Sequence, residues 1–192
     1  MSKIARYTGV AMLFHWTVGI LILLNVVLGL AAQYNLISAD QERPVINFHK
    51  STGLLVLVLV VLRLLWRFTH TPPALPANYK PWEVTASHLA HFGLYVVALG
   101  LPLSGWAHDS AWSMAAQFPF SWYGLFSWPH IGFIEDMAPA AKELWHARLG
   151  VMHTWFGYAL YALLAAHVLG ALKHQFIDKE PELQRMLPWG GE

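Results

Sequence analysis

The chain has 192 residues, of which 56% are hydrophobic and only 12% are charged, and its formal net charge is +1. A soluble domain carries about 25% charged residues, so this composition is typical of a membrane protein. The near-neutral charge gives no support for nucleic-acid binding through a basic surface. Because cysteine is absent, disulfides and thiolate metal sites are excluded, and any metal would be bound by histidine, methionine or carboxylate.

Four segments are long and apolar enough to cross a bilayer, which takes about 20 helical residues. They predict transmembrane helices at residues 9–32, 49–69, 86–107 and 149–172. Lys, Arg, Asp and Glu are absent from three of these helices, and the second contains only Arg63 and Arg67 besides Lys50 at its start. We therefore predict an all-α integral membrane protein, a four-helix bundle in which residues 1–192 form a single domain.

The basic residues predict the orientation of this bundle. Eight Lys and Arg residues fall on the side that holds both termini, and four fall on the opposite side. Cytoplasmic loops are enriched in Lys and Arg, so we expect the N and C termini in the cytoplasm. The outer segment between the third and fourth helices, residues 109–147, is rich in aromatic residues and is expected to lie along the membrane interface.

The chain contains eleven histidines, and several fall inside the predicted helices. An ionisable side chain within the membrane is costly and is therefore a functional candidate, although a single histidine could equally be a hydrogen-bonded packing residue. At 1.5 Å per residue, four of them group into two levels. His15 and His167 lie at an inner level, and His49 and His153 lie at an outer level.

His153 and His167 share one face of the fourth helix, because fourteen residues return to within about 40° and advance about 21 Å. His15 would complete the inner level and His49 the outer level. Two paired imidazoles in apolar surroundings are what two bis-histidine haems b stacked across a membrane require. Pairing His146 with His167 would span about 31 Å, the full hydrocarbon thickness, so the spacing favours His153 without excluding His146.

Glycines follow three of these histidines one helical turn later, at Gly19, Gly53 and Gly157. A residue without a side chain beside a ligand would allow a flat macrocycle to lie against the backbone. The alternative is that these glycines serve ordinary packing between transmembrane helices, where small residues are common.

Charged residues lie close to both levels. Arg63 follows His49 by fourteen residues on nearly the same face, where it could neutralise haem propionates at the inner level. The alternative is that Arg63 extends to the inner headgroups. Arg43, Lys50 and Arg148 cluster near the outer level and could bind propionates or attract a small anion.

The remaining histidines are expected near the membrane surfaces. His88 and His91 would lie at the inner start of the third helix, too shallow to match His15. Together with His174 they are candidates for proton delivery to a quinone, and the alternative is interfacial hydrogen bonding. We expect the other three, His70, His108 and His130, in loops.

Several motifs together resemble the prokaryotic cytochrome b561 family. They are FHW in the first helix, FHKSTGLLVLVLVVLRLLWRFTHTPPALP in the second, WEVTASHLAHFGLYVVALGLPLSGW in the third and HVLGALKHQFIDKEPELQRMLP at the end of the fourth. The resemblance covers essentially the whole chain, and AHDSA departs from the small-residue turn expected after LPLSGW. It implies a multi-pass cytochrome of the bacterial inner membrane with two haems b. The implied ligands are the pairs already named, His15 with His167 and His49 with His153.

The family includes a superoxide oxidase, in which superoxide donates electrons at the periplasmic face and ubiquinone accepts them. The resemblance therefore implies a superoxide:ubiquinone oxidoreductase that yields dioxygen, with Lys50, Arg43 and Arg148 attracting superoxide. The alternative is an electron-transfer subunit that links a partner dehydrogenase or hydrogenase to the quinone pool. A histidine-lined metal transporter would need intramembrane carboxylates, and the four predicted helices contain no Asp or Glu.

Overall fold

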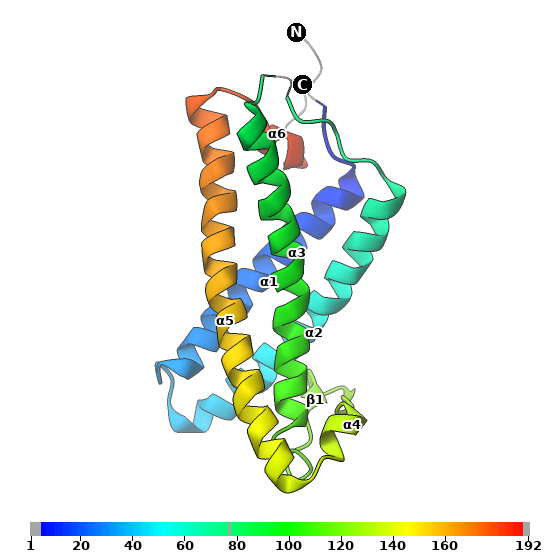
Figure 1. The fold of residues 1–192 in the computed structure, drawn as a ribbon, viewed down its shortest axis with the longest axis vertical. Coiled ribbons are helices and arrows are strands. Elements are labelled where there is room, and N and C mark those ends of the chain that lie inside the picture. The colour runs from blue at the N-terminus through cyan, green and yellow to red at the C-terminus, as the bar shows by residue number, and fades with distance from the viewer. Residues whose placement is uncertain (1–4, 77, 190–192) are drawn as a thin grey trace.

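The computed structural model describes residues 5–76 and 78–189. Its four long helices are α1 (Gly9–Gln33), α2 (Ala39–Thr69), α3 (Pro81–Ser110) and α5 (Pro139–Leu172) (Figure 1). Each of them is long and apolar enough to cross a membrane. The predicted all-α, four-helix membrane bundle is therefore confirmed.

Short elements complete the chain at the two ends of the bundle. A two-residue antiparallel ladder joins β1 (Ser121–Trp122) to β2 (Phe126–Ser127), and the single turn α4 (Gly132–Glu135) follows it. A π-helical turn, η1 (Lys173–Ile177), extends α5, and α6 (Glu182–Met186) follows. None of these elements is long enough to span a bilayer.

Three of the long helices begin earlier than the hydropathy pattern predicts. The first turn of α2 contains acidic residues, which favour a helix N-terminus, and α5 begins with a proline at its first positions. At the start of α3, the Glu83 carboxylate accepts a hydrogen bond from the Lys80 amide at 2.9 Å and caps the helix. These extensions are polar, so hydropathy alone does not detect them.

The helices pack in sequence order, α1 on α2, α2 on α3 and α3 on α5. In Figure 1, α3 and α5 run side by side along the long axis, and α1 and α2 cross behind them at an angle. A buried cluster from α1, α2 and α3 joins the two pairs, and it consists of Val18, Val56, Val60 and Ala98. Within the described residues α1 and α5 barely touch, which leaves a space between the α1–α2 pair and the α3–α5 pair.

The segments next to both chain termini meet at one end of the bundle, which we call the inner end (Figure 1). The Tyr7 amide donates to the Arg185 carbonyl at 3.1 Å, and the Arg6 guanidinium donates to the carbonyls of Gln184 and Leu187. The predicted cytoplasmic location of the termini concerns residues 1–4 and 190–192. These lie outside the described residues. The opposite end is called the outer end.

The outer end is covered by residues 111–138, which we call the outer cap. The Trp122 indole donates to the Ser51 carbonyl at 3.1 Å, and the Tyr123 amide donates to the Ser51 hydroxyl at 3.0 Å. Phe120, the residue before β1, is buried. The aromatic segment predicted between the third and fourth helices is thus shorter than expected and folds onto α2 at Ser51.

Arg185 holds the inner end together. Its side chain is only 5% exposed. It donates to three backbone carbonyls and one carboxylate, those of Ala5, Pro73, Ala74 and Glu182. One guanidinium thus joins the N-terminal segment, the proline-rich link between α2 and α3, and α6.

We expect Arg185→Ala to lower the free energy of unfolding by about 3 kcal/mol, because it leaves buried carbonyls and a carboxylate without their donor. Unfolding in detergent, followed by circular dichroism, measures the change. Lys179→Ala is the matched control, since Lys179 is exposed at the same end and should shift stability by about 0.5 kcal/mol or less. Equal effects of the two substitutions would contradict the role of Arg185.

Candidate functional site

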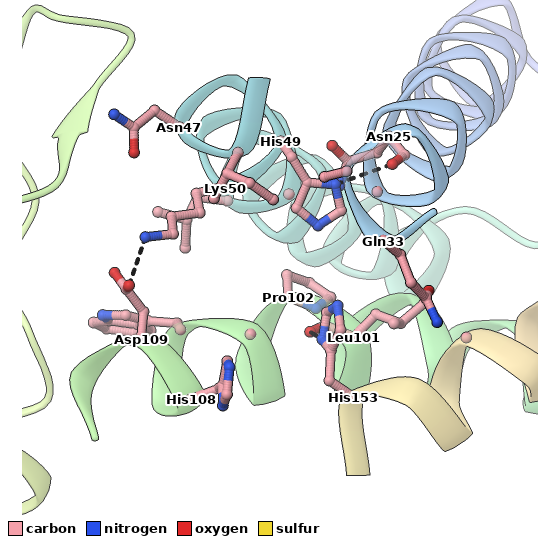
Figure 2. Close-up of a pocket in the computed structure, with 18 of the residues that line it drawn as sticks. Asn25, Gln33, Asn47, His49, Lys50, Leu101, Pro102, His108, Asp109 and His153 are labelled. Atoms are coloured by element: carbon pink, nitrogen blue, oxygen red, sulfur yellow. Dashed lines mark hydrogen bonds and ion pairs between the residues drawn. The ribbon is translucent and has the colours of Figure 1, made fainter. Parts of the chain in front are cut away.

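A cavity of about 1000 Å³ lies between the two helix pairs in the outer half of the bundle. Residues of α1, α2, α3, α5 and the outer cap line it. Figure 2 shows His49 of α2 and His153 of α5 facing each other across this space. The cavity therefore lies where depth along the helices predicts the outer histidine level.

The rings of His49 and His153 have centroids 6.2 Å apart at an interplanar angle of 77°. An imidazole nitrogen binds a metal at about 2 Å, so two imidazoles on opposite sides of one ion have ring centres about 6 Å apart. The observed spacing therefore fits one iron atom between the two rings.

Backbone hydrogen bonds fix the tautomer of both rings. His49 Nδ1 lies 3.0 Å from the Asn25 carbonyl oxygen, and His153 Nδ1 lies 3.0 Å from the Leu101 carbonyl oxygen (Figure 2). A carbonyl can only accept, so each Nδ1 carries the hydrogen and each Nε2 keeps a lone pair. Metal-bound histidines are commonly oriented in this way by a partner of the second nitrogen.

Two glycines permit these contacts. A Cβ atom at Gly29 would lie 3.0 Å from His49 Cε1, and one at Gly105 would lie 3.2 Å from His153 Cε1. Each glycine follows the accepting carbonyl by four residues and so lies directly beside the approaching ring. The sequence pattern gives no signal for Gly29 or Gly105, because their histidine partners lie on other helices.

The glycines predicted from the i+4 pattern leave space. A Cβ atom at Gly19 would meet no atom within 4 Å, and the nearest atoms to one at Gly157 would be 3.8 Å away. Gly53 and Gly157 both line the cavity. The structure is therefore compatible with a flat group lying against the backbone at these two positions.

At the inner level, the ring centroids of His15 and His167 are 6.0 Å apart, which again matches two imidazoles around one ion. The surroundings differ from the outer level, because an Arg63 Nη2 atom lies 3.2 Å from His15 Nδ1. A guanidinium can only donate, so Nδ1 is the acceptor here and Nε2 carries the hydrogen. Binding of iron by His15 Nε2 therefore requires Arg63 to leave this contact.

His91 also belongs to the inner level. Its ring centroid is 5.4 Å from that of His167, so the prediction that it is too shallow is wrong. The physical reason is that α3 begins at Pro81, which places His91 about 15 Å into the helix. His88, by contrast, is exposed on the same helix. The inner level thus contains three imidazoles, two of which are candidate partners of His167.

His174 lies apart from this group, about 10 Å beyond His167 along the helix axis. Its ring stacks on Tyr79 with centroids 4.2 Å apart, and Nδ1 lies 2.6 Å from an Asp178 carboxylate oxygen. The hydrogen bond from Lys173 holds the pKa of Asp178 below its usual value, and the bond from His174 acts in the same direction. The predicted trio of His88, His91 and His174 is therefore not assembled at one point.

The three predicted outer cations are only partly brought together. Lys50 Nζ lies 2.5 Å from an Asp109 carboxylate oxygen (Figure 2), and the Arg43 guanidinium lies 3.8 Å from the centre of the Phe118 ring. Both Lys50 and Arg43 line the cavity. Arg148 is not among the lining residues, and its guanidinium instead faces the ring of Trp145. The structure therefore brings two of the three predicted cations to the cavity, and Arg148 lies in the part of α5 that precedes the predicted span.

Asp109 is a functional candidate that the sequence motifs do not identify as such. It is the aspartate of AHDSA, the stretch that departs from the expected family turn. His130 of the outer cap lies 3.9 Å from its second carboxylate oxygen. Lys50 therefore approaches the cavity as one member of an ion pair and not as a free cation.

His108 was expected in a loop but lies in the last turn of α3, which extends to Ser110. Its ring stacks on that of His146 with centroids 3.9 Å apart. Each Nδ1 donates to the other residue's carbonyl at 2.9 Å. His146 is thus paired with His108, whereas His49 faces His153, and this geometry favours His153 as the outer partner. His70 and His130 lie outside the long helices, as predicted.

Comparison with known proteins identifies relatives of this chain. The family model for prokaryotic cytochrome b561 matches residues 6–189. Cytochrome b561 homolog 2 of Escherichia coli K12 is 30% identical over 182 residues, which cover 95% of this chain and 91% of that protein. Cytochrome b561 homolog 1 of the same organism is 31% identical over 141 residues, 73% of each chain.

A further relative is described as a probable superoxide oxidase, CybB, of Yersinia pestis. It is 26% identical over 140 residues, which cover 73% of each chain. The family match extends over nearly all of the described residues and includes all four long helices. The chain therefore belongs to the prokaryotic cytochrome b561 family, a family of bacterial membrane electron-transfer proteins that bind haem b.

Proposed function

We propose that this protein is a superoxide:ubiquinone oxidoreductase of the bacterial inner membrane. Two superoxide ions would be oxidised to two molecules of dioxygen, and one ubiquinone would take up the two electrons and two protons. The inner end would face the cytoplasm and the outer end the periplasm, as the distribution of Lys and Arg predicts. The relative described as a probable superoxide oxidase supports the choice of substrate.

The observation on which this proposal rests is the pair His49 and His153 at the cavity. Their 6.2 Å spacing and preset Nδ1–H groups are suited to axial ligation of one haem b. His15 and His167 are the proposed ligands of a second haem b, with Arg63 the proposed partner of its propionates. When bound, the haems would supply the one-electron redox chemistry.

The residues of the chain would perform three tasks around these groups. The backbone carbonyls of Asn25 and Leu101 orient the imidazoles of His49 and His153 and set the tautomer that each presents. Gly53 and Gly157 keep the cavity wall open. Hydrogen bonds from the outer cap to Ser51 hold the cap against α2, where it covers one side of the outer site.

Charge at the outer mouth would control the arrival of superoxide. Arg43 and Lys50 line the cavity, and each would attract an anion from the aqueous phase. Asp109 opposes this attraction, because it neutralises Lys50 at 2.5 Å. Arg148 contributes only through the long-range field, since it does not line the cavity.

Reduction of ubiquinone requires protons as well as electrons. His91 is the strongest candidate for their delivery at the inner level, because its ring contacts His167 and it lies on a different helix. His88 and His174 would act only at the inner surface, where one is exposed and the other is paired with Asp178.

The function is tested by anaerobic stopped-flow mixing of the oxidised protein with superoxide, following the haem α-band with and without a soluble quinone. We expect rapid reduction, followed by reoxidation that depends on quinone. The rate should fall as ionic strength rises, because salt screens the attraction of the anion. A normal bis-histidine spectrum that superoxide fails to reduce would contradict the proposal and favour an electron-transfer subunit fed by a partner protein.

Haem content tests the ligand assignment. We expect about two haems per chain in the wild type and about one in His49→Ala or His153→Ala, because each removes an axial ligand of the outer group. His146→Ala is the matched control and should retain both, since His146 is paired with His108. The pyridine haemochromogen assay gives the number directly.

The same assay resolves the inner pair. His15→Ala should lose the inner haem, whereas His91→Ala should keep it with an unchanged α-band. If His91→Ala loses one haem and His15→Ala does not, the assignment of His15 is wrong and the inner pair is His91 with His167.

The ion pair at the mouth makes a prediction about rate. Asp109→Asn should raise the second-order rate constant with superoxide about fivefold at low ionic strength, which corresponds to about 1 kcal/mol between charges in water. Lys50→Gln should lower it by a similar factor. Stopped-flow rates over a range of salt concentrations provide the measurement, and Lys142→Gln serves as a control for removal of a more distant outer charge. If Asp109→Asn lowers the rate, the carboxylate does not act by neutralising Lys50.

A further inference from the structure

A second pocket, of about 160 Å³, lies at the inner end, far smaller than the central cavity. It is bounded by the start of α1, the last turns of α2 and the proline-rich link, with single residues from α3 and α6. We call it the inner pocket and define it by its polar lining residues, Arg6, Tyr7, Thr8, Arg63, Trp66, Arg67, His70, Thr71 and Tyr95. None of the proposed axial ligands lines it.

The inner pocket is strongly basic. Three guanidinium groups line it, those of Arg6, Arg63 and Arg67, and its lining contains neither Asp nor Glu. Within the described residues, no carboxylate lies within ion-pair distance of any of the three. Positive charge gathered at a pocket without a counter-ion favours an anionic ligand.

The neighbours of these arginines do not neutralise them. Arg6 donates to two backbone carbonyls, and Arg63 donates to His15 and lies 5.4 Å from the centre of the Tyr95 ring. These contacts satisfy hydrogen bonds but leave the charge unpaired. Arg6 and Arg63 are half-buried, whereas Arg67 is exposed. A half-buried cation without a counter-ion is costly, and an incoming anion would relieve that cost.

Neutral donors and rigid walls complete the pocket. The Trp66 indole donates to the Thr8 hydroxyl at 3.2 Å, and His70 stacks on Trp66 with ring centroids 3.7 Å apart. Tyr7 and Tyr95 also line the pocket, and a tyrosine hydroxyl can donate to an oxyanion. Guanidinium forks and hydroxyl groups together are typical of phosphate recognition.

The position of the pocket indicates where the phosphate comes from. It lies where α1 begins and α2 ends, at the level of the headgroups on the inner face. Large apolar side chains on these same helix ends are open to the surroundings, with Leu13 67%, Leu65 57% and Phe68 82% exposed. A lipid could therefore place its headgroup among the arginines and its acyl chains along this apolar surface.

We propose that the inner pocket binds the phosphate headgroup of an anionic phospholipid from the inner leaflet. Arg67 is exposed and forms no ion pair with a described carboxylate, Arg63 is the deeper cation, and Arg6 fixes the pocket wall by holding the C-terminal segment. The site takes no direct part in the proposed superoxide oxidation, but it shares Arg63 with the proposed inner haem, whose propionates this residue would also bind.

Binding of short-chain phosphatidylglycerol to the full-length, haem-loaded protein in a non-ionic detergent tests the proposal. Dioctanoyl phosphatidylglycerol should bind saturably and dioctanoyl phosphatidylcholine at least tenfold more weakly, because only the first carries a net negative charge. Arg67→Gln should weaken the binding of phosphatidylglycerol about fivefold, the loss expected for one basic residue near a lipid surface. Isothermal titration provides the affinities, and the haem spectrum confirms that each variant is folded.

Two further variants make the test specific. Arg67→Lys should retain most of the affinity because it keeps the charge, and Lys179→Gln should retain all of it because Lys179 lies at the same end but outside the pocket. Equal binding of the two lipids, or equal losses in Arg67→Gln and Lys179→Gln, would overturn the proposal. Inorganic phosphate binding as tightly as phosphatidylglycerol would overturn the lipid assignment and make this a site for free phosphate.

Discussion

The candidate haem site depends on one kind of hydrogen bond, from a histidine Nδ1–H to a backbone carbonyl of the neighbouring helix. A helical carbonyl already accepts a bond from the amide four residues later, and its second lone pair is free to accept another. Within a continuous helix, a ring can approach that lone pair closely where the residue four positions later has no side chain. Gly29 beside Asn25, and Gly105 beside Leu101, meet this condition for His49 and His153.

The same arrangement occurs a third time, where it does not involve a proposed ligand. His108 donates to the His146 carbonyl, and a Cβ atom at Gly150, four residues later, would lie 3.0 Å from the His108 ring. Each of the three bonds joins two helices of the same pair, α1 with α2 or α3 with α5. These histidine-to-carbonyl hydrogen bonds therefore connect the two helices within each pair. The cavity lies between the pairs.

The sequence is sufficient to predict the four spans and the two histidine levels. Both the hydropathy of a segment and the depth of a residue in the membrane follow from position along the helix. The sequence is not sufficient to predict which residues of different helices face each other. It also does not show how far each helix extends beyond its apolar segment. Gly29 and Asp109 are recognised only when a residue from another helix lies beside them. His91 was misplaced for the second reason, since α3 extends beyond its apolar segment.

The two histidine levels differ in how far they are prepared for a ligand. At the outer level the carbonyls fix the lone pairs on Nε2, and the cavity is already open beside them. At the inner level Arg63 holds His15 in the opposite tautomer. A group bound there must therefore draw the guanidinium away, and a propionate carboxylate has the charge to do so. Because the same arginine also borders the inner pocket, the anions at this end compete for one cation, and the occupancy of one site would affect the other.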